Sequence, residues 1–79
     1  MLDELKTANK VVGIKQIRKA MAAGKVQKVF LAADADPMLT EPIAEQCRAR
    51  QIEVISVPTM HQLGAACGIP VKAAAAAIL

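Results

Sequence analysis

Short strand-like and helix-like segments alternate along this chain, and no other feature of the sequence constrains the fold as strongly. β-Rich apolar runs extend from Lys10 to Gly13, from Lys28 to Ala33 and from Ile52 to Val57, and a helix-favouring segment follows each run. Strands that alternate with helices predict an α/β sandwich with helices on both faces of the sheet. The 79 residues have room for one small domain, over residues 1–79, with a thin core.

Two of the expected helices lie in the middle of the chain. The segment from Ile14 to about Ala23 carries apolar residues at helical spacing and should end at Gly24. A second helix is expected from Thr40 to Arg50, with Thr40 as its cap. Pro42 is compatible with that helix only in its first turn, where a proline costs no hydrogen bond.

Further helical segments are expected toward both ends. Leu2 to Ala8 is a short candidate with acids in its first turn. The segment from Thr59 to about Cys67 begins with a capping box formed by Thr59 and Gln62, and Gly68 should end it. Ala73 to Ala77 prefers helix by propensity, but a small-residue strand against a crowded helix layer is the alternative, which Ile78-Leu79 favours weakly.

Several classes of protein are excluded by what the composition lacks. Phe30 is the only aromatic residue, which argues against a protein that stacks single-stranded bases on aromatic side chains. The longest apolar run, Ala73 to Leu79, is far shorter than the roughly 18 residues of a membrane span. Cys47 and Cys67 lie twenty residues apart without a CxxC motif, so we expect two free, buried thiols in a reducing cytoplasm and no metal site.

Basic and acidic residues are segregated along the chain. From Lys6 to Lys28 there are seven basic residues and no acid, whereas most of the acids come later. Small soluble domains usually interleave the two signs, so this segregation predicts one positive surface that faces a polyanion such as nucleic acid. The alternative is a solvated basic face that only aids solubility.

The strand-to-helix junction at Gly13 is the most informative site in the sequence. The first turn of a helix has free N–H groups and a partial positive charge, which together attract anions. Lys15 in that turn opposes the helix dipole, and Lys19 one turn later repels Lys15, so a bound anion would relieve both effects. Gln16 offers a donor and an acceptor that suit base edges. A solvated polar helix face remains the alternative.

Catalytic chemistry is not indicated. Asp34 and Asp36 lie two residues apart beside Pro37, where turn and cap roles explain both. His61 and Cys67 are six residues apart on one expected helix, so their side chains point in different directions. The sequence has neither a Walker loop nor a dinucleotide fingerprint. We therefore expect no enzyme activity and no cofactor.

Three segments resemble a known family. GIKQIRKA (13–20), AADADP (32–37) and LGAACGIPVKAA (63–74), in this order, resemble the kink-turn RNA-binding ribosomal proteins of the L7Ae and L30e type, and within them the short bacterial YbxF-like members. The resemblance spans about Lys10 to Leu79. It implies a three-layer α/β/α sandwich with a four-stranded mixed sheet whose last strand is the alanine-rich segment. It also implies binding of a kink-turn, a sharply bent RNA duplex with tandem sheared G·A pairs.

The resemblance also assigns residues to the RNA interface. The strand-to-helix start should enter the widened groove at the sheared pairs. The Asp-Pro turn should lie near a looped-out nucleotide, and the loop before the last strand should pack against that nucleotide and tune specificity. By position these residues are Gly13, Lys15, Gln16, Lys19, Asp36, Ile69, Pro70, Val71 and Lys72.

The chain departs from the family pattern at several positions, in this interface and in the helix before the loop. Lys15-Gln16 stands where the archaeal members have Asn-Glu, so base-edge reading must change while attraction to phosphate rises. His61, Gln62 and Ala65 occupy helix positions that usually carry lysines, and Pro70 should stiffen the loop.

We therefore expect a monomeric cytoplasmic module that binds structured RNA containing a kink-turn, with the ribosome as a further candidate partner. No membrane, metal or cofactor is expected. Two alternatives remain open: a ribosome-associated structural protein that has kept the fold but lost kink-turn binding, and a module that binds a protein or a small anion at the same helix start.

Overall fold

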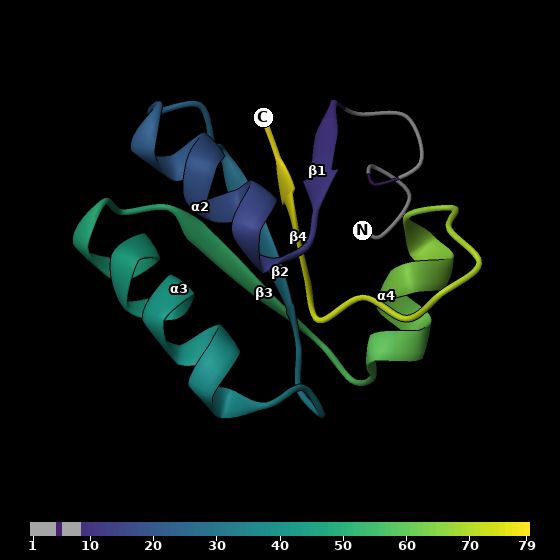
Figure 1. Ribbon diagram of the computed structural model, residues 1–79. Coiled ribbons are helices and arrows are strands. Elements are labelled where there is room, and N and C mark those ends of the chain that lie inside the picture. The colour runs from purple at the N-terminus through teal and green to yellow at the C-terminus, as the bar shows by residue number, and fades with distance from the viewer. Residues whose placement is uncertain (1–4, 6–8) are drawn as a thin grey trace.

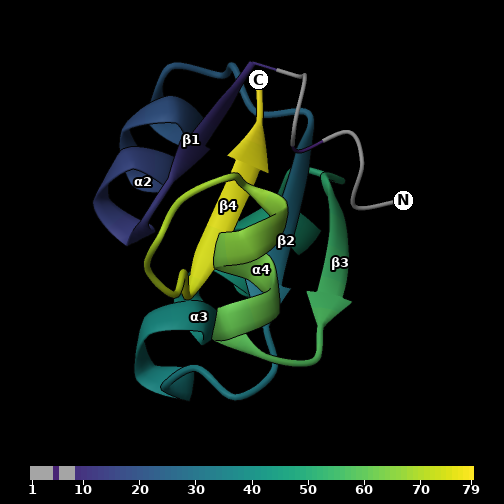
Figure 2. The same cartoon turned by 90° about the vertical axis from the view of Figure 1, so that its right-hand side faces the viewer.

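The computed structural model describes Leu5 and residues 9–79, which form three layers (Figures 1 and 2). The central sheet consists of β1 (Lys10–Val12), β2 (Lys28–Ala32), β3 (Glu53–Val57) and β4 (Ala75–Ile78). The helices are α2 (Ile14–Ala22) and α3 (Pro37–Ala49) on one face and α4 (Met60–Ala66) on the other. The predicted α/β/α architecture is thus confirmed.

The sheet is mixed, with the strand order β1-β4-β2-β3. Strand β4 runs antiparallel to both β1 and β2, whereas β2 and β3 are parallel. The alanine-rich segment is therefore a strand, as the family resemblance implied. Ala75 and Ala77 face the α2 and α3 layer while Ala76 faces the α4 layer, and all three are fully buried. Small side chains let a central strand lie between two helix layers.

Each face of the sheet has its own apolar cluster. On one face, Ile17 and Met21 of α2 pack with Ile43 of α3 against Val29. On the other face, Phe30 packs with Leu63 of α4. Alternate residues along β2 thus serve opposite cores, as the two-residue period of a strand requires.

The cap of helix α3 lies four residues earlier than the sequence predicted. Asp36, not Thr40, is the cap: its Oδ1 accepts a hydrogen bond from the Met38 N–H at 2.9 Å. Pro37 then occupies the first helical position, where its missing N–H and fixed φ favour the helix. Pro42 consequently lies inside the helix and not in its first turn. Pro42 has no N–H to donate to the Met38 carbonyl one turn earlier. Because Met38 and Pro42 are both exposed, water can hydrate that carbonyl instead.

The other predicted helix ends are confirmed. Gly24 follows α2 with a φ of +71°, and Gly68 follows α4 with a φ of +77°. Thr59 Oγ1 accepts a hydrogen bond from the Gln62 N–H at 3.0 Å, which is half of the predicted capping box. The short helix expected from Leu2 to Ala8 lies outside the described residues, except that Leu5 is helical and buried in the apolar cluster around Phe30 and Leu63, which we call the α4 cluster.

One hydrogen bond between the ends of α2 and α3 was not indicated by any local sequence pattern. Arg50, which follows α3, donates a hydrogen bond from its Nη1 to the Met21 carbonyl near the end of α2. The cation lies where the dipole of α2 is negative, so it stabilises the end of that helix while joining it to α3. Among the described residues, no helix is long and apolar enough to cross a membrane.

Both cysteines are free and buried, as predicted, and they lie in clusters on opposite faces of the sheet. Burial raises the pKa of each thiol, and at Cys67 the nearby charge of Lys10 offsets part of that rise. Because the thiolate is the reactive form, we expect negligible reaction with a thiol reagent in the native protein at pH 7 and two reactive thiols in denaturant. A thiol that reacts rapidly without denaturant would contradict this burial.

Candidate functional site

Three segments that are distant in the sequence meet at one end of the sheet, which we call the loop end (Figure 1). They are the β1–α2 junction at Gly13, the β2–α3 turn (33–36) and the loop before β4 (69–74). The Gly13 N–H donates to the Ala75 carbonyl at 3.0 Å, and the Ala32 N–H donates to the Ala74 carbonyl at 2.9 Å. The start of β4 therefore lies between the Gly13 junction and the end of β2, and it accepts a backbone hydrogen bond from each of them.

The start of α2 is not capped by a side chain. Gly13 occupies the cap position, no side chain bonds to the first turn, and that turn holds no acid. By contrast, Asp36 caps α3 and Thr59 caps α4. Among the described helices, α2 alone thus presents an uncapped N-terminus, whose N–H groups and partial positive charge suit an anion.

Position 13 requires a glycine because of its backbone conformation, and not because a side chain would lack space there. Its φ of +104° lies in the region that side chains disfavour, yet a Cβ built there would meet nothing within 4 Å. The side of Gly13 where a side chain would stand is therefore open. A ligand can approach the backbone directly at the point where α2 begins.

Basic side chains continue along the exposed side of α2. Lys15, Arg18 and Lys19 are all exposed, whereas Ile17 and Met21 point into the core. Lys15 and Lys19 are one helical turn apart, so the positive charge extends from the uncapped first turn into the second. An ion pair of the described residues, between Lys28 Nζ and Glu53 Oε1 at 3.7 Å, lies at the opposite end of the sheet, away from these three cations.

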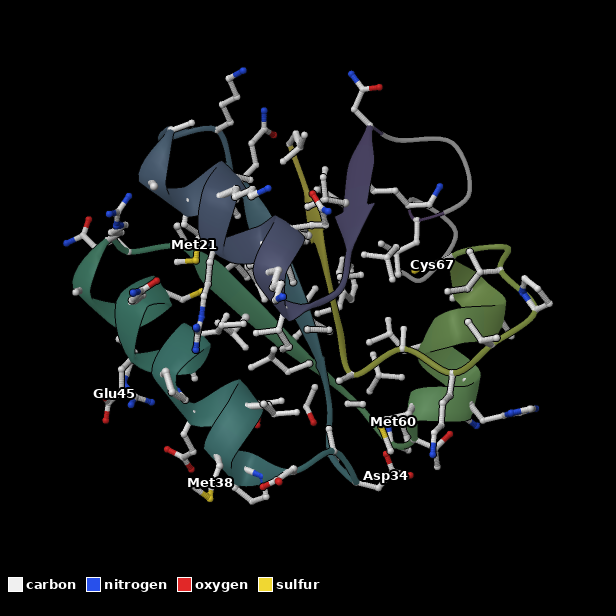
Figure 3. The ribbon with its side chains drawn as sticks, viewed as in Figure 1. Met21, Asp34, Met38, Glu45, Met60 and Cys67 are labelled. Atoms are coloured by element: carbon white, nitrogen blue, oxygen red, sulfur yellow. The ribbon has the colours of Figure 1, made fainter. Side chains whose placement is uncertain are left out.

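The two aspartates of the β2–α3 turn have structural roles. Asp36 caps α3, as described above, and remains exposed. Asp34 Oδ1 accepts a hydrogen bond from the Met60 N–H at 2.7 Å, and Figure 3 shows the two residues side by side. Asp34 thereby fixes the start of α4 against the end of β2. This second cap was not predicted, because the sequence gives no local signal for a bond between residues 26 positions apart.

The loop before β4 has two anchored ends and an exposed middle. The Ile69 N–H donates to the Gly64 carbonyl at 3.2 Å, and the Ile69 side chain is half-buried against the α4 cluster. At the other end, the Ala73 N–H donates to the Met60 carbonyl at 3.0 Å. Between them Pro70, Val71 and Lys72 are exposed, and Val71 leaves 64% of its surface open to solvent. Ile69 thus positions the loop, while the next three residues face outward.

Gly64 allows this loop to lie against α4. A Cβ at Gly64 would come within 2.1 Å of the Val71 carbonyl oxygen and 3.1 Å of Lys72 Cα. Only glycine lets the two backbones approach this closely. This role of Gly64 was not predicted from the sequence, although a glycine inside a helical pattern is a known signal of close approach.

The fold and the loop end together define a class of protein. It is a small α/β/α sandwich with an uncapped, basic helix start beside two loops, and its described residues include no group of three His, Cys, Asp or Glu side chains able to hold a metal ion. An open helix start of this kind suits an anionic partner. The chain belongs to the ribosomal protein L7Ae/L30e/S12e/Gadd45 family, whose model matches residues 2–79.

Relatives and solved structures agree with this assignment. An RNA-binding protein of Geobacillus sp. (strain WCH70) is 40% identical over 75 residues, which are 95% of this chain and 92% of the relative. RNA-binding protein YbxF of Geobacillus stearothermophilus is 39% identical over 69 residues, covering 87% and 84% of the two chains. The structure of a 15.5 kD RNA-binding protein of Giardia lamblia superimposes with a TM-score of 0.87 at 26% identity, covering 98% of this chain and 68% of the other. The resemblance seen in the sequence is thereby confirmed.

Proposed function

We propose that this protein is a non-enzymatic RNA-binding module that recognises kink-turns at its loop end. The observation that carries the proposal is the uncapped, basic start of α2, beside which Gly13 leaves the backbone open. Relatives that match most of the chain are named RNA-binding proteins, which supports an RNA ligand over a small anion. The two buried, free thiols suit a reducing cytoplasm.

In this proposal the loop end binds the bent RNA from two sides. The α2 start, with Gly13, Lys15, Gln16 and Lys19, would face the sheared pairs and their phosphates. The exposed residues Pro70, Val71 and Lys72, together with Asp36, would face the looped-out nucleotide, with Ile69 holding the loop in place. A protein that binds only the bent form shifts the RNA toward the kink.

A gel shift with two RNAs tests the proposal. One is a simple kink-turn duplex, and in the other the tandem G·A pairs are replaced by Watson–Crick pairs. We expect binding to the second RNA to be at least about tenfold weaker, because it lacks the bend and the sheared-pair edges. Equal binding to both RNAs would mean that the loop end is only a generic basic surface. Co-sedimentation with ribosomes would then favour the ribosome-associated alternative.

A further inference from the structure

A hollow of about 450 Å³ lies between the first turns of α2 and α3, next to the proposed kink-turn contact. Its volume is within the range of small-molecule sites. Aliphatic side chains and cations line it together, and none of the lining residues is acidic. The lining residues are Gly13, Ile14, Lys15, Gln16, Arg18 and Leu39.

The apolar part of the hollow results from the early start of α3. Because Asp36 caps the helix, Leu39 lies in its first turn and lines the hollow with Ile14 of α2. Leu39 leaves 45% of its surface exposed, whereas Ile14 is half-buried. Met38, the preceding residue, is 82% exposed but does not line the hollow, and Figure 3 shows it pointing away from the molecule.

The cationic part of the hollow comes from α2. Lys15 and Arg18 line it from one helix, and both side chains are exposed. Paired RNA shows a protein mainly phosphates, ribose hydroxyls and groove edges, none of which needs an aliphatic floor. An unpaired nucleotide presents an apolar base face together with a phosphate, so it matches both parts of the hollow. An arginine can also stack its guanidinium plane on such a base.

We infer that this hollow receives an unpaired nucleotide of the bound RNA, from the strand that continues past the kink-turn contact. The base contacts Ile14 and Leu39, and its phosphate lies near Lys15 and Arg18. The inference rests on the proposed function, because Lys15 and Gln16 line the hollow and also belong to the proposed kink-turn contact. The nucleotide therefore lies directly beside the helix start that binds the kink.

Two variants and two kinds of RNA test this inference. The RNAs are a flush-ended kink-turn duplex and the same duplex with two unpaired nucleotides at one end, made once for each of the four strand ends. The variants are Leu39→Glu, which puts an acid into the hollow, and the matched control Met38→Glu. Both changes add one negative charge to the same helical turn, where an acid is compatible with the helix dipole.

We expect the unmodified protein to bind one of the extended RNAs about tenfold more tightly than the flush duplex. Leu39→Glu should abolish that gain and leave the affinity for the flush duplex close to that of Met38→Glu. Fluorescence of 2-aminopurine at the unpaired position should change on binding to the unmodified protein and to Met38→Glu, but not on binding to Leu39→Glu.

The failures of the two proposals are distinguishable. If the flush duplex does not bind at all, the proposed function is wrong and the inference fails with it. If the flush duplex binds but no extension increases affinity, the proposed function stands and the hollow does not take a nucleotide. If both variants lose the gain equally, the effect is one of general charge, and the inference is again overturned.

Discussion

Replacing Gly64 by alanine is expected to lower the free energy of unfolding by about 2 kcal/mol, although alanine is the better helix former. The added Cβ would lie 2.1 Å from the Val71 carbonyl oxygen, which belongs to the backbone and cannot move away as a side chain could. The loop before β4 must therefore shift. Urea denaturation measures the loss of stability, and binding to a kink-turn duplex should weaken as well, because Val71 and Lys72 move with the loop.

The exposed neighbour Ala65 provides the matched control on the same helix. Ala65→Gly changes helix propensity in the opposite direction and adds no atom, so it should cost about 1 kcal/mol and leave RNA affinity unchanged. If propensity alone mattered, Gly64→Ala would stabilise the protein while Ala65→Gly destabilised it. A stabilised Gly64→Ala variant would show that the loop does not depend on close approach to α4.

The second large effect is expected from removing both cations of the α2 start. The Lys15→Ala/Lys19→Ala variant should bind a kink-turn duplex about 100-fold more weakly at low salt, and its log–log salt slope should be smaller by about 2. The thermal stability of the free protein should not fall, because Lys15 opposes the helix dipole and repels Lys19. A loss of binding without a loss of stability identifies a functional role and not a structural one.

Two cations at the other end of the molecule provide the control for charge alone. Lys25 and Arg48 are exposed and lie near the ends of α2 and α3, away from the loop end. The Lys25→Ala/Arg48→Ala variant has the same net charge as the first variant but should keep most of its affinity. Equal losses in the two double variants would mean that RNA responds to overall charge and not to the α2 start.

The parts of the fold that could be predicted from the sequence follow mostly from local signals. The strands at Lys28 and Glu53 and the stops at Gly24 and Gly68 follow from apolar runs and glycine positions. The start of α3 was predicted wrongly because Asp36-Pro37 is compatible with either a turn or a capped helix start. The neighbouring sequence does not distinguish these two possibilities.

Contacts between distant segments account for what could not be predicted. The bonds from Met60 to Asp34 and from Arg50 to Met21 join residues 26 and 29 positions apart. At the candidate site, the junction at Gly13 was predicted from local pattern, with its uncapped helix start. The division of the loop into an anchoring Ile69 and an outward Val71 depends on how the loop lies against α4, which only the folded chain determines.

The position of β4 has a consequence for the synthesis of the protein. This strand follows all the other described elements in the sequence, yet it lies between β1 and β2, which do not pair with each other. A nascent chain cannot close its sheet before β4 has left the ribosome, and the pairing of β1 with β4 spans nearly the whole described chain. The hydrogen bonds donated by the Gly13 and Ala32 N–H groups also need the carbonyls of residues 75 and 74. The loop end is therefore assembled only after translation has passed β4.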